Sequence, residues 1–151
     1  MISDVTFDRS RFRPSPHKFE AGTGNIAGAV GLGAAIEYVT GIGLNAIAEY
    51  EHVLLQYATG ALQGVPGIRI IGTAGEKESV LSFVIQSLEP DKIGRALDTE
   101  GIAVRAGHHC ALPILRKYGL EGAVRMSLAL YNTRDEIDAL VSVLHTLAAS
   151  R

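Results

Sequence analysis

Apolar residues spaced three and four apart predict the helices of this chain. The spacing runs through residues 45–62, where Glu and Gln separate the apolar positions, and again through 133–148. Thr133, followed by two acidic residues, is the expected cap of that last helix. A further helix is expected to begin at Pro90 and run through Leu97.

Short runs rich in β-branched residues predict the strands. Residues 68–71 and 80–85 are two such runs, and the polar turn between them favours their pairing. Shorter strands are expected over 102–105 and 124–128. Helices and strands therefore alternate in a mixed order, which predicts an α+β fold, a two-layer sandwich with helices covering one face of a small sheet.

The N-terminal part of the chain has a different pattern. Residues 26–38 are apolar nearly all round and contain three glycines, each of which costs a helix roughly 1 kcal/mol against Ala, so a helix here is expected to be buried. Residues 1–19 are basic, contain prolines and predict an extended arm or linker. We thus expect an arm (1–19), an interdomain loop and helix (20–42) and a small C-terminal domain (43–151).

Composition narrows the function classes. Of 151 residues, 47% are hydrophobic and 20% are charged, and the net charge is −2, which is typical of a soluble globular protein and gives no reason to expect a nucleic-acid partner. No secretory signal is visible, and apolar stretches are interrupted well before the roughly 20 residues that span a membrane, so a cytoplasmic protein is expected. One cysteine excludes an internal disulfide and fits a reducing compartment.

The densest cluster of reactive side chains is 105–113. Cys110 precedes an expected helix start at Pro113, and the positive end of the helix dipole together with Arg105 favours the thiolate, the form that attacks electrophilic sulfur. The alternative is a small cysteine buried beside a turn.

Two more groups near this cluster have candidate roles. His108 and His109 would point to opposite sides of an extended backbone, and no second ligand pair follows, so no metal site is expected. Arg125 lies in an otherwise apolar strand fifteen residues after Cys110, where a carboxylate is the natural partner. The alternative is a solvated strand face with a local Glu as its partner.

The loop 20–25 contains Gly22 and Thr23 immediately before a helix. Small residues, a hydroxyl and backbone donors there make a candidate phosphate cradle. A simple turn and helix cap is the alternative.

These segments together resemble the C-terminal third of group II (SufS-type) cysteine desulfurases and the related selenocysteine lyases, within the class V aminotransferase family. The resemblance runs from near Phe19 to the end of the chain. It implies the small α+β domain of a fold type I transferase that depends on pyridoxal phosphate (PLP), packed on a large PLP-binding domain. The matching motifs are FEAGTGN at 19–25, VGLGAAIEY at 30–38, RAGHHCA at 105–111 and VRMSLALYNT at 124–133.

The resemblance also implies the chemistry. Cys110 would attack the sulfur of L-cysteine bound to PLP, releasing L-alanine and keeping a persulfide that passes to a sulfur-acceptor protein for iron–sulfur cluster assembly. Arg125 would hold the substrate carboxylate, with Arg105 as a second cation. His108 and His109 are candidates for proton handling.

By the same resemblance, Thr23 and Gly22 would contact the cofactor phosphate of the partner subunit in a homodimer. Gly24 departs from the family, which usually has proline there. The Schiff-base lysine belongs to the large domain, which this chain is expected to lack, and Lys18 is not expected to replace it. The chain alone should therefore neither bind PLP productively nor turn over cysteine.

Three other readings stay open at the level of sequence. The intact parent could be a selenocysteine lyase acting on L-selenocysteine. The chain could be a free-standing persulfide carrier. It could also dimerise through the apolar helix face from Ile26 to Ile36.

Overall fold

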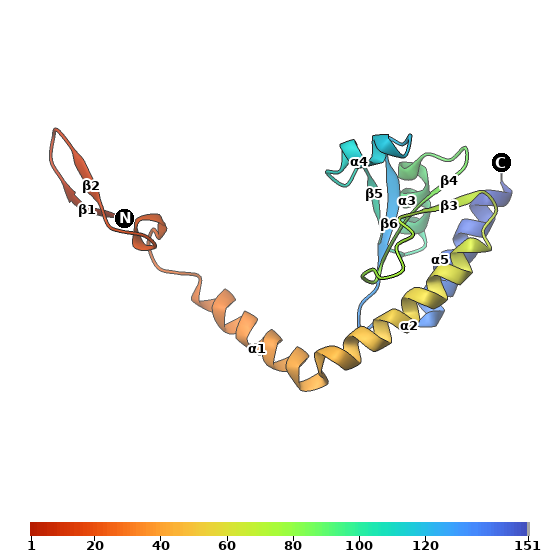
Figure 1. Cartoon of the computed structure of the whole chain (residues 1–151), viewed down its shortest axis with the longest axis horizontal. Helices are drawn as coiled ribbons and strands as arrows, with labels where there is room; N and C mark the ends of the chain where they lie inside the picture. The colour runs from red at the N-terminus through yellow and green to blue at the C-terminus, as the bar shows by residue number, and fades with distance from the viewer. Residues whose placement is uncertain (151) are drawn as a thin grey trace. The chain divides into compact units, whose positions relative to one another are not determined.

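The computed structural model describes residues 1–150, which divide into two compact units, residues 1–44 and residues from 45 onward (Figure 1). The first unit is built mainly from local contacts. Its hairpin is closed by bonds within the turn, where Thr6 N–H donates to the Arg9 carbonyl (2.8 Å) and Arg9 N–H to the Thr6 hydroxyl (3.3 Å). The segment expected to be an arm thus contains regular structure. The unit comprises β1 (Ile2–Val5), β2 (Ser10–Phe12), a 3-10 turn η1 (His17–Phe19) and α1 (Ile26–Ile42).

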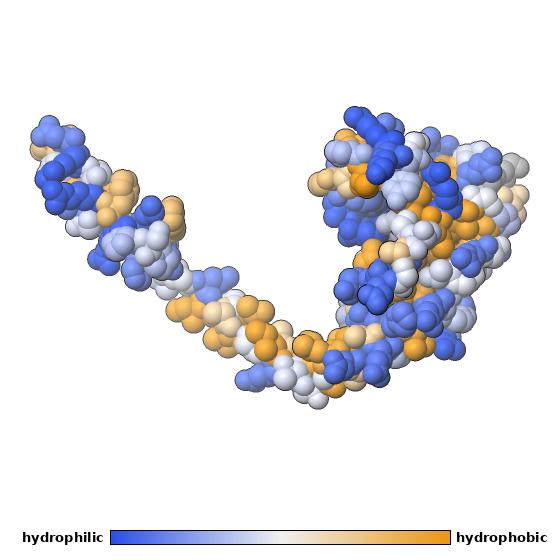
Figure 2. Space-filling model, in the orientation of Figure 1, coloured by the Kyte–Doolittle hydropathy of each residue, from blue (hydrophilic) through white to orange (hydrophobic). Residues whose placement is uncertain are grey.

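Helix α1 begins where the apolar run at 26–38 predicts and extends four residues beyond that run, to Ile42. The Asn25 side chain caps its start by accepting the Gly28 N–H (2.9 Å), and Gly43 ends it with a φ of 97°. The expectation of burial was wrong, because no residue of α1 is buried, and Ile26 and Val30 are 65% and 68% exposed. An apolar helix surface shows that the helix is able to pack against a partner, but it does not show that the partner is present. No segment of the described chain covers α1. Figure 2 shows the resulting apolar surface along α1.

The second unit is a two-layer α+β sandwich, as predicted. Its four strands form one antiparallel sheet in the order β3-β4-β6-β5, and the expected pairing of β3 with β4 is confirmed. Helices α2, α3 and α5 contribute to the single core cluster against one face of that sheet. The elements are α2 (Leu44–Gln63), β3 (Ile68–Ile71), β4 (Val80–Ile85), α3 (Pro90–Thr99), β5 (Arg105–Gly107), α4 (Leu112–Lys117), β6 (Ala123–Ser127) and α5 (Arg134–Ala149).

Alternation along β4 decides which face of the sheet is covered. Leu81, Phe83 and Ile85 are at most 2% exposed and point into the core, whereas Ser82 and Val84 between them point to the opposite face. The core faces of the helices come from residues at helical spacing, as the sequence predicts. They are Leu54, Ala58 and Leu62 of α2, Ile93 and Leu97 of α3, and Ile137, Leu140 and Leu144 of α5.

Strand β5 begins three residues later than predicted and ends two residues later. Ile102 does not join the ladder, because its N–H donates to the Leu97 carbonyl (2.9 Å) and closes the C-terminal end of α3 after Gly101, whose φ is 76°. Ile102 and Val104 instead pack their side chains against the core. The pairing residues are therefore those from Arg105 onward.

The capping box of α5 gives a stability prediction. Thr133 accepts the Glu136 N–H, and the Glu136 carboxylate accepts the Thr133 N–H (2.8 Å), which lowers the pKa of Glu136. Thr133→Ala is expected to lower the free energy of unfolding by about 1 kcal/mol. Urea denaturation measures it, with Thr133→Ser as the control that keeps the cap. Equal stability of the Ala and Ser variants would contradict the role of the cap.

Within residues 1–150, no single helix is long and apolar enough to cross a membrane. Only α1 and α2 taken together reach that length and composition.

Candidate active site

Two arginines lie side by side on the open face of the sheet, which is the face that the core helices do not cover. Arg105 of β5 is the register partner of Arg125 of β6, and Arg125 is in turn opposite Ser82 of β4. Like charges directly opposite in a sheet repel each other, so this arrangement favours an anion between them. The Nε atom of Arg125 is buried and has no hydrogen-bond partner in the described part of the chain. A planar carboxylate fits such a donor set, because guanidinium groups bind it through paired N–H donors.

Cys110 lies in the loop that follows the strand carrying Arg105. Strand β5 ends at Gly107, and α4 begins at Leu112, so Cys110 is upstream of a helix start, as predicted, with Pro113 in the first turn. The thiol is exposed, which excludes the alternative of a buried structural cysteine. The fold therefore places the nucleophile in the loop that follows β5, the strand that carries Arg105 opposite Arg125.

The loop from His108 to Ala111 has an unusual backbone. His109 and Cys110 have φ values of 55° and 56°, in the left-handed region that residues other than glycine seldom adopt. Within the loop, the Cys110 N–H donates to Nδ1 of His108 (3.0 Å), and the Ala111 N–H donates to the His108 carbonyl (2.8 Å). These bonds hold the turn that presents the thiol.

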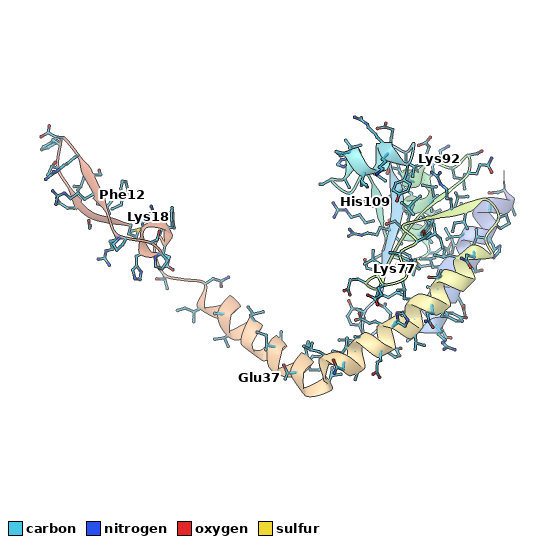
Figure 3. All side chains as sticks on the ribbon, viewed as in Figure 1. Phe12, Lys18, Glu37, Lys77, Lys92 and His109 are labelled. Carbon is cyan, nitrogen blue, oxygen red and sulfur yellow. The ribbon has the colours of Figure 1, made fainter. Side chains whose placement is uncertain are left out.

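The side chain of His109, labelled in Figure 3, forms a hydrogen bond with the backbone of β6. Its Nε2 lies 2.9 Å from the Ala123 carbonyl oxygen, and its Nδ1 is buried without a partner among residues 1–150. Burial lowers the pKa of His109, the bond to Ala123 opposes this, and the charges of Arg125 and Arg105 lower it further.

This shift predicts a pH dependence of stability. The pKa of His109 in the folded chain is below its ordinary value of 6.5. The stabilisation that depends on the neutral ring is therefore fully present above that pH. As the pH falls below 6.5, the unfolded chain binds the proton first, and the free energy of unfolding decreases. Chemical denaturation at several pH values between about 7.5 and about 5 checks this, with a shallower slope expected for His109→Gln. An unchanged slope would contradict the assignment.

Thr23 and Gly22 belong to the first unit, whereas the residues described above belong to the second. They lie in the loop before α1; Gly22 has a φ of 73° and open space around it, and Thr23 is exposed. The Thr23 hydroxyl makes no hydrogen bond to any residue that the structure describes. Lys18 lies in η1 (Figure 3), with its ammonium 4.8 Å from the centre of the Phe19 ring.

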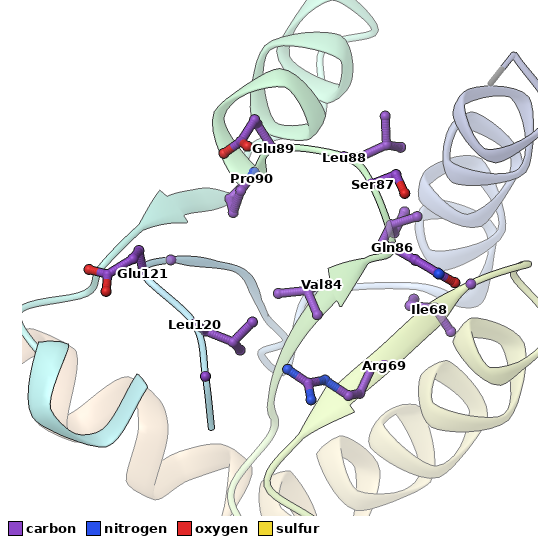
Figure 4. A pocket seen from close by; sticks show the side chains of 14 residues that line it. Ile68, Arg69, Val84, Gln86, Ser87, Leu88, Glu89, Pro90, Leu120 and Glu121 are labelled. Carbon is purple, nitrogen blue, oxygen red and sulfur yellow. The ribbon is translucent and has the colours of Figure 1, made fainter. Parts of the chain in front are cut away.

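A cavity of about 720 Å³ is lined by the start of β3, the end of β4, the loop between β4 and α3, and the loop after α4 (Figure 4). None of the residues predicted for the site lines it. Its one cation, Arg69, already donates to the Tyr118 carbonyl (3.3 Å). The candidate active site is thus the arginine pair on the open face of the sheet together with the Cys110 loop, and none of these residues lines this cavity. No group of three or more His, Cys, Asp or Glu side chains in residues 1–150 is arranged to hold a metal ion.

Two contributors to the site were missed in the sequence. Ser82 is the polar residue of an apolar strand, and its position between Leu81 and Phe83 was a usable signal that it faces away from the core. Nothing in the sequence could have indicated the role of the Ala123 carbonyl, because every residue has a backbone carbonyl group.

Residues 1–140 match the family described as aminotransferase class-V. The chain belongs to this family. A cysteine desulfurase from Synechococcus elongatus is 59% identical over 147 residues, which cover 97% of this chain and 24% of that protein. A probable cysteine desulfurase from Streptomyces coelicolor is 49% identical, over 95% of this chain and 35% of that protein.

Solved structures of cysteine desulfurases agree with the fold. The apo cysteine desulfurase from Thermococcus onnurineus NA1 superposes with a TM-score of 0.86 at 38% identity, covering 99% of this chain and 38% of that one. The cysteine desulfurase CsdA from Escherichia coli, described as the S-sulfonic acid, has a TM-score of 0.84 at 35% identity, covering 99% of this chain and 37% of that one. The chain spans about a quarter to a third of the curated relatives it matches.

Class V cysteine desulfurases use PLP as intact enzymes, and the residues present fit part of such a site. Gly22 leaves room for a ligand, and the Thr23 hydroxyl is an available donor beside the start of α1. These features suit a phosphate contact. Lys18 contacts its neighbouring ring in a separate turn, and nothing in the described residues positions it as a cofactor lysine.

Proposed function

We propose that this chain is the sulfur-accepting part of a cytoplasmic, SufS-type cysteine desulfurase that takes sulfur from L-cysteine for iron–sulfur cluster assembly. The observation that carries the proposal is the exposed thiol of Cys110 in the loop that follows the strand pairing Arg105 with Arg125. A thiol nucleophile and a fixed carboxylate are what the removal of sulfur from an amino acid requires.

Each residue has one role in this proposal. Arg125, with Arg105 beside it, binds the substrate carboxylate and orients the substrate sulfur toward Cys110. The Cys110 thiolate attacks that sulfur: a sulfur–sulfur bond forms, the carbon–sulfur bond breaks, and its electron pair stays on carbon. That carbon takes a proton, so the products are L-alanine and a persulfide on Cys110.

The chemistry that PLP supplies when bound is an electron sink for the substrate carbon. In a homodimer, Thr23 and Gly22 of one subunit would bind the phosphate of the PLP held by the partner subunit. Because the chain spans only part of its relatives, we propose that it is inactive alone and that the parent protein holds PLP elsewhere.

The exposure of Cys110 also supports transfer of the persulfide to an acceptor protein, because a second protein can reach the thiol. The same exposure is what a free-standing persulfide carrier would need. The arginine pair binds the carboxylate of L-selenocysteine equally well, so a selenocysteine lyase parent is the remaining candidate.

A segment exchange tests the proposal. The chain would replace the matching segment of the Synechococcus elongatus relative, and L-alanine would be measured with L-cysteine and PLP present. We expect the chimaera to form L-alanine and the isolated chain to form none. A folded chimaera without activity, or activity of the isolated chain, would contradict the proposal. Competition between cysteine and selenocysteine on the chimaera decides the substrate.

A further inference from the structure

The loop that carries Cys110 needs a contact outside the loop to fix its position relative to the sheet. His109 and Cys110 are consecutive left-handed residues, and neither is glycine. Such a conformation persists only where surrounding contacts hold it. The bonds made by His108 lie inside the loop and cannot fix its position relative to the sheet.

His109 supplies that tie. Its Nε2 meets the carbonyl oxygen of Ala123, a residue fourteen positions later, at 2.9 Å. A carbonyl oxygen only accepts, so Nε2 carries the hydrogen, and in the neutral ring Nδ1 has none. Ala123 is fully buried and is the register partner of Gly107, so the carbonyl belongs to the hydrogen-bonded sheet.

The opposite ring nitrogen argues against a role in moving protons. Nδ1 of His109 is buried and meets no hydrogen-bond partner within residues 1–150. A proton added there would create a buried cationic donor without an acceptor, which is costly. The charged or titratable groups that act on the ring are Arg125 of β6, Arg105 of β5 and His108 of the loop. All three oppose a positive charge on His109.

We propose that His109 is a positioning residue that stays in its Nε2–H tautomer, ties the Cys110 loop to β6 through Ala123, and takes no part in proton transfer. The tie also connects the nucleophile with the carboxylate-binding residue, because Ala123 is two residues before Arg125 on the same strand. This inference rests on the proposed function only for the role of Cys110. The tautomer and the tie stand on the geometry of the chain itself.

The test uses the chain as it is. Nitrogen-15 NMR of the imidazole rings at neutral pH is expected to show His109 neutral with the hydrogen on Nε2. An imidazolium, or a hydrogen on Nδ1, would overturn the proposal without any variant having to fold.

Variants then test the tie through the rate at which Cys110 reacts with a small disulfide reagent. His109→Asn tolerates a left-handed backbone but is too short to reach Ala123, whereas His109→Gln can place an amide donor near the Nε2 position. We expect the His109→Asn variant to react at a rate that differs from the wild type by about fivefold, which corresponds to the free energy of one ordinary hydrogen bond. The His109→Gln variant should react at the wild-type rate. His145→Asn, at an exposed histidine of α5, is the matched control and should not alter the rate.

Equal rates for the wild type and both His109 variants would overturn the proposal, as would a change in the Asn variant that the Gln variant does not restore. These outcomes are separate from those of the proposed function, because neither the ring tautomer nor the thiol rate depends on L-alanine formation. In an active chimaera, the same Asn variant should lower kcat while leaving the KM for L-cysteine nearly unchanged, since the arginines still bind the carboxylate.

Discussion

In the chimaera with the Synechococcus elongatus relative, Cys110→Ser is expected to reduce L-alanine formation by more than about 100-fold. The thiolate is the nucleophile toward sulfur, and a serine hydroxyl is protonated at neutral pH and cannot replace it. Because Cys110 is exposed, the substitution should leave stability unchanged. The measurement is the rate of L-alanine release at saturating L-cysteine.

A matched variant separates the nucleophile from substrate binding. Arg125→Lys keeps the positive charge but loses the paired donors, so its main expected effect is a higher KM for L-cysteine. Undiminished L-alanine formation by Cys110→Ser would mean that another group accepts the sulfur, and the role proposed for Cys110 would fall.

Phe83→Ala is expected to lower the free energy of unfolding of the C-terminal unit by about 3–5 kcal/mol. Phe83 is 0% exposed on β4, a central strand of the sheet, and its loss leaves a cavity between the sheet and the helices. That is a large part of the roughly 5–15 kcal/mol that stabilises an ordinary domain. Urea denaturation followed by circular dichroism gives the value.

Two controls accompany that measurement. Phe83→Leu keeps most of the apolar volume and should cost clearly less than the alanine variant. Phe19→Ala, at a residue 77% exposed, should change stability by less than about 0.5 kcal/mol. A Phe83→Ala variant as stable as the Phe19→Ala variant would show that the sheet and helices do not share one core.

Local signals predicted most of the C-terminal unit. The strands at 68–71 and 80–85 match β3 and β4 residue for residue, and the predicted cap of the last helix at Thr133 is confirmed. Each of these features depends on neighbours within a few positions, which a sequence shows directly. The strand predicted at 102–105 begins only at Arg105, because the Ile102 N–H donates a hydrogen bond to the preceding helix and is not available to the sheet.

The sequence by itself determined the periodicity of each element, the caps, the family motif and the identity of Cys110, Arg105 and Arg125 as candidates. Only the tertiary structure decided that the two arginines are register partners and that the Cys110 loop is tied to Ala123 through His109. It also decided that α1 is exposed in this chain. The reason is physical: periodicity shows which face of an element is apolar, but strand register and burial depend on partners distant in sequence or absent from the chain.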